Sequence, residues 1–72
     1  MPQVDPVMLI QKMRRAGISM ATMARDTGIS HVKIRRISAG DMKKPDYLSV
    51  RKIYNLALSR LNEQEISECR IA

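Results

Sequence analysis

The three glycines of this chain, Gly17, Gly28 and Gly40, are eleven and twelve residues apart, and each follows a stretch with apolar residues at helical spacing. Glycine adopts the left-handed conformation that ends a helix without steric cost. This spacing limits the first three elements to short helices. No strand pattern persists beyond three or four residues. We therefore expect an all-α fold, a compact bundle of four to five short helices.

A residue suited to capping the amino end of a helix precedes each of these three helices. Its side-chain oxygen accepts a hydrogen bond from a backbone amide that the helix leaves free. Asp5, followed by Pro6 at the first helical position, predicts a helix over roughly 6–16. Ser19 and Ser30 predict two further helices, each ended by the next glycine and joined to one another by a tight turn.

The rest of the chain predicts one long helix and a final short segment. Asp46 is an N-cap candidate for the long helix, whose apolar stripe comprises Val50, Ile53, Ala57 and Leu61. Asn62 and Glu65 have the spacing of a capping box. Residues 63–69 therefore form either a fifth short helix or a continuation of the fourth.

The charge of the chain is high and unevenly distributed. Thirteen Lys and Arg against seven Asp and Glu leave a net charge of +6. Residues 1–60 carry a net charge of +8, and residues 61–72 carry a net charge of −2. A strongly basic surface predicts a polyanionic partner. Modules that bind RNA or single strands stack bases on aromatic side chains, and this chain has only Tyr47 and Tyr54. Duplex DNA is therefore the favoured partner.

The sequence offers no constellation of catalytic or metal-ligating residues. An enzyme needs a nucleophile with a base, a pair of carboxylates in a cleft or a metal cluster. His31 is the only histidine, and no second histidine or cysteine lies at ligand spacing. We expect no enzymatic activity, no metal, no cofactor and no small-molecule substrate.

The single cysteine and the absence of long apolar runs bear on location. Cys69 cannot form an internal disulfide, and we expect an inert thiol near a mobile terminus. No run of eighteen apolar residues occurs, and the amino end lacks the layout of a signal peptide. We expect a cytoplasmic protein that associates with the nucleoid through DNA and does not bind membranes.

The stretch from Met20 to Gly40 carries small, apolar and capping residues in an informative order. Ala24 is small where two helices would cross, Gly28 allows the backbone to reverse, and Ser30 caps the next helix. The apolar residues that would close a small core are Met23, Ile29, Ile34 and Ile37. This pattern resembles the helix-turn-helix of the Cro/repressor type, the lambda-repressor-like or XRE-like family. Lys43, Lys44, Pro45, Ser49, Val50 and Ile53 extend the resemblance, which covers roughly residues 7–58.

The resemblance implies a helix-turn-helix DNA-binding domain over residues 1–60, with its core at about 19–39. Residues 61–72 would be a short acidic segment that serves as a tail or in dimerisation, with Ile66 and Ile71 as apolar contacts. The implied function is that of a small phage-type Cro repressor, a homodimer that occupies a palindromic operator in double-stranded DNA. The alternatives are of two kinds. A transcription activator or an excision factor would use the same motif, and an antitoxin or other interaction protein would use the acidic tail.

The predicted third helix presents one basic face. Ile34 and Ile37 define its buried direction. The opposite face and its flanks carry His31, Val32, Lys33, Arg35, Arg36 and Ala39. Arginine suits the paired acceptors of guanine, and a short apolar side chain suits the thymine methyl group. Residues near the amino end of such a helix reach base edges. We predict base readout by His31, Val32, Arg35 and Arg36, and the resemblance implies the same role for the positions of His31, Val32 and Arg36.

Phosphate contacts are expected on either side of this helix. Free amides at the start of the second helix favour an anion. The predicted phosphate-contacting residues are Ser19, Met20, Lys33, Lys43 and Lys44. The family usually carries glutamine at the position of Met20, often as a contact to a phosphate or a base. A methionine side chain cannot make the hydrogen bond of that contact. The family often carries glutamate at the position of Ser38, so an ion pair to the first helix is absent.

Overall fold

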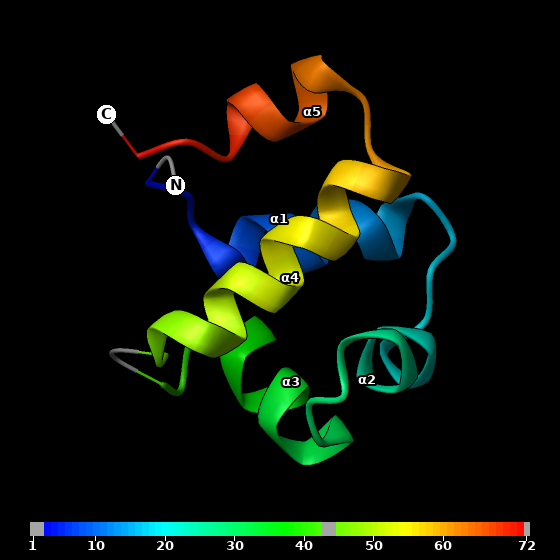
Figure 1. Cartoon of the computed structure of the whole chain (residues 1–72), viewed down its shortest axis with the longest axis vertical. Coiled ribbons are helices and arrows are strands. Elements are labelled where there is room, and N and C mark those ends of the chain that lie inside the picture. Colours follow the sequence, from blue (N-terminus) through cyan, green and yellow to red (C-terminus); the bar gives the residue numbers. More distant parts are fainter. Residues whose placement is uncertain (1–2, 43–44, 72) are drawn as a thin grey trace.

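The computed structural model describes residues 3–42 and 45–71 (Figure 1). Across these residues it contains five helices and no strand, so the predicted all-α class is confirmed. The helices are α1 (Pro6–Arg15), α2 (Met20–Thr27), α3 (His31–Ser38), α4 (Tyr47–Arg60) and α5 (Glu63–Glu68). Figure 1 shows α2 and α3 at one end of the molecule and α5 at the other, with α1 and α4 between them.

Each helix begins at the residue that the sequence predicts. The N-cap residues, whose side chains each accept a backbone N–H of the helix that follows, are Asp5, Ser19, Ser30, Asp46 and Asn62. Asn62 Oδ1 accepts from the Glu65 amide at 2.8 Å, and Glu65 Oε1 accepts from the Asn62 amide at 3.1 Å. Leu61 and Asn62 have extended backbones. Residues 63–68 therefore form a separate fifth helix rather than a continuation of α4.

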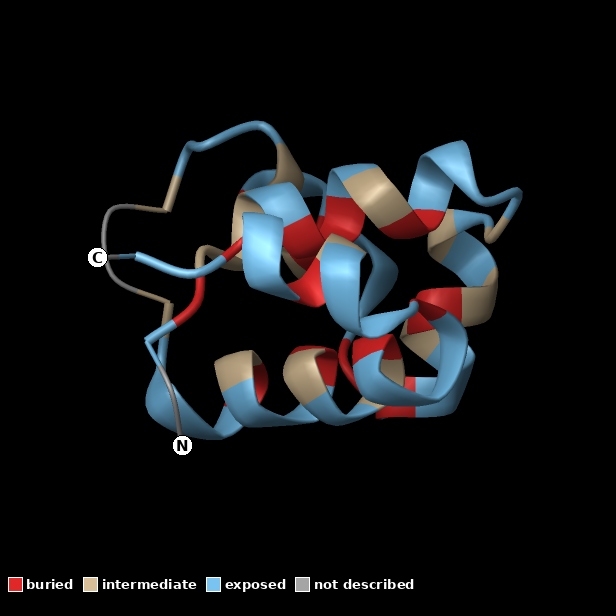
Figure 2. Cartoon of the chain, turned by 90° about the horizontal axis from the view of Figure 1, so that it is seen from above, coloured by how far each residue is buried: buried red, intermediate tan, exposed pale blue. Residues whose placement is uncertain are grey.

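The core lies in the space that the five helices enclose. Its largest fully buried side chains are Leu9, Ile10, Met13, Met23, Ile34, Ile37, Ile53 and Cys69. Figure 2 shows the buried residues of neighbouring helices facing one another. The helix α1 packs against α3 and α4, and α2 packs against the same two helices. Because α3 lies against both α1 and α2, its orientation is set by the whole core.

The C-terminal segment, residues 61–71, packs into this core and is not a free tail. Cys69 has no exposed surface, which corrects the expectation of a thiol near a mobile terminus. The Asp5 amide donates to the Cys69 carbonyl at 2.8 Å, and Val4 forms an isolated antiparallel bridge with Arg70. Ile66, one of the two apolar residues expected at a dimer surface, is buried in the core, whereas Ile71 is exposed. Burial also raises the pKa of the Cys69 thiol, which keeps it protonated at neutral pH.

The connection between α2 and α3 is a three-residue turn, Gly28–Ser30. Gly28 has a φ of 74°, and its amide donates to the Ala24 carbonyl at 2.9 Å. The Thr27 hydroxyl donates to the Met23 carbonyl at 2.6 Å and accepts from the Ile29 amide at 3.2 Å. The Gly28 and Ile29 amides are therefore bound locally, and the turn fixes where α3 starts.

The left-handed conformation of Gly28 gives a stability prediction. A Cβ added at this position would meet nothing within 4 Å, so a substitution is strained by the backbone conformation alone. We expect Gly28→Ala to lower the free energy of unfolding by about 1–2 kcal/mol in urea titrations. Asparagine tolerates this conformation better, so Gly28→Asn should lose less. Equal losses for the two variants, or none for alanine, would show that the turn is not held in this conformation.

Candidate nucleic-acid interface

The exposed face of α3 carries all four residues predicted to contact bases. The helix buries Ile34 and Ile37, which face the core. His31, Val32, Arg35 and Arg36 are exposed, and Val32 keeps 59% of its surface in solvent. Val32 is not part of the hydrophobic core, although it is apolar. This composition is suited to contact with an external partner.

The start of α2 and the exposed side of α3 enclose a shallow hollow. It is lined by Met20, Val32, Arg35, Arg36, Ser38, Ala39 and Asp41. The hollow therefore brings together Met20, predicted to contact phosphate, and three of the four residues predicted to contact bases. His31 is exposed at the amino end of α3 and does not line the hollow.

A second hollow adjoins the first and adds two arginines that the sequence analysis did not select. It is lined by Ile10, Gln11, Arg14, Arg15, Met20 and Ser38, so it shares two residues with the first. Arg14 and Arg15 are exposed in the last turn of α1. The available signal was their position just before the Gly17 turn, which brings the end of α1 beside the start of α2.

The arginines that line these hollows take part in none of the ion pairs found among the described residues. The pairs are Lys12–Glu68 at 3.0 Å, Arg25–Asp26 at 3.4 Å, Lys33–Asp46 at 2.6 Å and Arg60–Asp26 at 3.3 Å. Among them, none includes Arg14, Arg15, Arg35 or Arg36. Among the residues that the structure describes, Asp41 is the only carboxylate that lines either hollow. This side of the molecule therefore presents a concentration of positive charge.

The remaining residues predicted to contact phosphate are placed differently. Lys33 donates to Asp46 Oδ1, so its ammonium group links α3 to the start of α4. An anion at Lys33 would have to compete with that carboxylate. Lys43 and Lys44 lie outside the described residues.

The start of α2 leaves backbone donors free. The Ser19 hydroxyl accepts from the Thr22 amide at 3.1 Å and shares a 3.0 Å hydrogen bond with the Thr22 hydroxyl. The amides of Met20 and Ala21 lie in the first turn, where a helix supplies no acceptor of its own. Ser19 therefore acts here as a helix cap, while the two amides beside it can meet an anion.

Two other kinds of site are absent from the described part of the chain. Within residues 3–42 and 45–71, no three His, Cys, Asp or Glu side chains are grouped closely enough to hold a metal ion. None of the helices described there has the length and apolar character needed to cross a membrane.

Comparison with known proteins returned no matching family model, no matching curated protein and no matching solved structure. The interpretation of this surface therefore depends on the residues and the geometry described above.

The ion pair between Lys33 and Asp46 gives a pH prediction. Hydrogen bonds from the Lys33 ammonium, the Ser49 hydroxyl and the Ser49 amide hold the pKa of Asp46 well below its usual range. Because the pKa is lowered by folding, the stabilisation is complete above the ordinary aspartate pKa of about 4 and is lost as the pH falls below it.

We therefore expect the native protein to be more stable than Asp46→Asn at pH 7, with the gap narrowing at pH 3 in urea titrations. Lys33→Met removes the other half of the pair and should also be less stable than the native protein at pH 7. This difference should narrow less at pH 3, because the Ser49 hydrogen bonds still lower the pKa of Asp46 in the variant. If the difference in stability between the native protein and Asp46→Asn is the same at both pH values, the assignment is contradicted.

Proposed function

We propose that this protein is a sequence-specific double-stranded DNA-binding transcription regulator, in which α2 and α3 form a helix-turn-helix and α3 is the recognition helix. We further propose that it acts as a homodimer that represses by occupying a two-fold symmetric operator, in the manner of a Cro-type repressor. The observation that carries this proposal is the exposed face of α3. There, Val32, Arg35 and Arg36 open onto a hollow that also contains the start of α2.

The chemistry of this face suits the major groove. A helix of eight residues fits the groove, where arginine meets the paired acceptors of guanine and valine meets the thymine methyl group. Ile34 and Ile37 are almost completely buried, so the helix that carries these side chains is held rigidly by the core. A fixed helix supports discrimination between bases because the contacting groups are positioned before DNA binds.

The second hollow suits the DNA backbone beside that groove. The free amides of Met20 and Ala21 and the guanidinium groups of Arg14 and Arg15 are donors for phosphate oxygens. Contacts of this kind fix the orientation of the protein on the duplex and carry no sequence information. The start of α2 and the end of α1 would thus hold α3 in register.

The distribution of other charged and aromatic residues favours a duplex. The acidic residues Glu63, Glu65 and Glu68 lie on α5, at the opposite end of the molecule from α2 and α3 (Figure 1). Both tyrosines, Tyr47 and Tyr54, lie on α4 and line neither basic hollow. The proposed surface therefore has no aromatic platform on which single-stranded bases would stack.

The alternative functions differ in how much support they receive. An activator or excision factor would use the same DNA-binding face, and the position of the operator would distinguish it from a repressor. An antitoxin would need its acidic tail to be available to a partner. Ile66 and Cys69 of this segment are buried in the chain's own core, so the segment is not a free tail and only its exposed face could meet a partner.

Selection of bound duplexes from a randomised DNA pool tests the proposed function. The expected result is enrichment of a short inverted repeat, with half-sites about 34 Å apart along the duplex. If all duplexes bind equally with a steep dependence on salt, the protein coats DNA without reading it. If no duplex binds, the basic face serves another partner.

Substitution of Arg36 tests the role of α3 on the selected duplex. We expect Arg36→Ala to cost about 1–3 kcal/mol in binding and to relax the preference at one base position, measured by fluorescence anisotropy with matched single-base variants. Arg51→Ala removes an exposed arginine from α4, outside both hollows, and should leave the preference unchanged. Uniform weakening of Arg36→Ala on all sequences would contradict base readout.

Substitution of Arg14 and Arg15 tests the second hollow. The double variant Arg14→Ala, Arg15→Ala should weaken specific and non-specific duplexes alike. The slope of log K against log salt should fall by about one unit for each phosphate contact that is lost. Anisotropy titrations at several salt concentrations measure this slope. An unchanged slope would place the DNA backbone elsewhere.

A further inference from the structure

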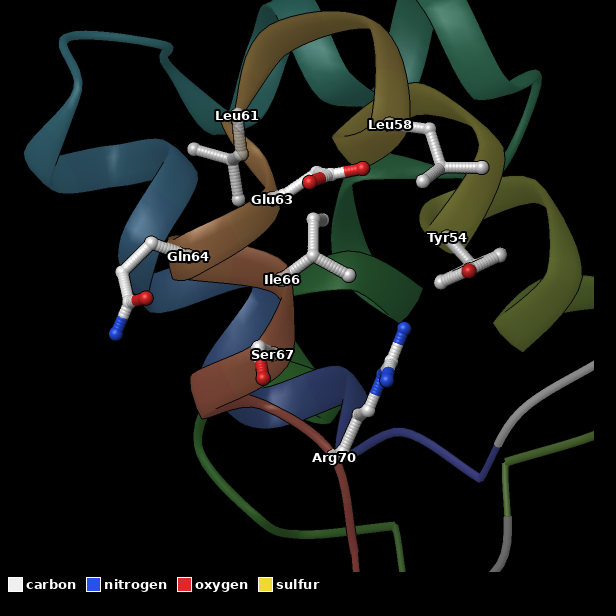
Figure 3. Close-up of a pocket in the computed structure, with 8 residues that line it drawn as sticks. All are labelled: Tyr54, Leu58, Leu61, Glu63, Gln64, Ile66, Ser67 and Arg70. Atoms are coloured by element: carbon white, nitrogen blue, oxygen red, sulfur yellow. The ribbon is translucent and has the colours of Figure 1, made fainter.

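A groove between α4 and α5 lies apart from the basic hollows. Tyr54 and Leu58 of α4 form one side, Ile66 of α5 lies at its centre, and Glu63 and Arg70 stand near its two ends (Figure 3). Ile66 is buried, whereas Leu58 keeps 51% of its surface exposed and Tyr54 is half-buried. The groove therefore combines a partly exposed apolar surface with one acidic and one basic side chain.

The two charges occupy opposite ends of α5. Glu63 is the first residue of α5, and Arg70 follows its last residue by two positions. Both side chains are exposed, and neither takes part in the ion pairs found among the described residues. An acidic end and a basic end make this surface complementary to a second copy of itself turned by 180°. A two-fold axis through the middle of α5 would set each Glu63 opposite the other copy's Arg70.

We propose that this groove is the surface through which two copies of the chain associate, with their α5 helices antiparallel. This inference deepens the proposed function and rests on it for the use of the dimer on DNA. The paired contacts would cover Leu58 and Tyr54 of both copies and would form two Glu63–Arg70 ion pairs.

The charge of the chain supports a second copy as the occupant of the groove. Each copy carries a net charge of +6, so most of its surface repels another copy. The segment 61–72 carries a net charge of −2, so contact through it keeps the basic surfaces of the two copies apart, while attraction comes from the opposed Glu63 and Arg70 side chains. In Figure 1, α5 lies at the opposite end from α2 and α3, so association there leaves both basic faces uncovered.

Sedimentation equilibrium of the full chain without DNA tests this contact through charge reversal. The native chain should form a reversible dimer. Glu63→Arg and Arg70→Glu should each weaken dimerisation at least about tenfold, because each places like charges together twice in a symmetric dimer. The double variant Glu63→Arg, Arg70→Glu should return to within about threefold of the native affinity, since the pairs are restored in reverse.

Two further variants serve as controls. Lys52→Glu makes the same charge change as Arg70→Glu at an exposed position of α4 that does not line the groove, and it should not weaken the dimer. Leu58→Glu changes α4 alone and should weaken the dimer even if the variants near α5 fold poorly. Circular dichroism confirms that each variant keeps its helices.

The outcomes separate this inference from the proposed function. A native chain that stays monomeric, a double variant no better than the single ones, or an unaffected Leu58→Glu dimer would overturn the contact. Duplex binding by a protein that never dimerises would contradict the contact and the proposed homodimer, but not the assignment of α3 as the recognition helix. A dimer that follows the expected variant pattern but ignores duplex DNA would contradict only the proposed function.

Discussion

The burial of Ile34 and Ile37 governs the rest of this structure because it fixes the rotation of α3 about its axis. Once these two side chains enter the core beside α1 and α2, Val32, Arg35 and Arg36 must face solvent. The three-residue turn after α2 sets where α3 begins, and the Lys33–Asp46 pair ties α3 to the start of α4. The proposed DNA-binding face thus follows from the packing of its own reverse side.

Basic side chains around the hollows and acidic side chains on α5 lie at opposite ends of the molecule. The four arginines around the two hollows gather beside α2 and α3, where the described ion pairs leave them unpaired. The acidic residues of α5 lie at the other end, where Glu68 is held by Lys12 of α1. This separation lets one small core carry the proposed surface for DNA and, at the other end, the proposed surface for a second copy.

Local signals were predictable from the sequence, and contacts between distant segments were not. An N-cap acts within three residues, so Ser19, Ser30 and Asn62 could be assigned from spacing alone. Cys69 is buried where its carbonyl accepts from the amide of Asp5, a residue 64 positions earlier, and no local pattern reports this contact. The Lys33–Asp46 pair and the position of Arg14 beside Met20 likewise arise only when helices pack. The exposed face of α3 was predictable because helical periodicity fixes it.

Mapping of the DNA contact surface by NMR would show directly whether α3 is the recognition helix. Isotope-labelled protein would be titrated with a duplex, and the shift of each backbone amide recorded. We expect the largest shifts in α3 from His31 to Arg36, in the first turn of α2 and at the end of α1. Large shifts confined to α4 and α5, with α3 unchanged, would contradict it.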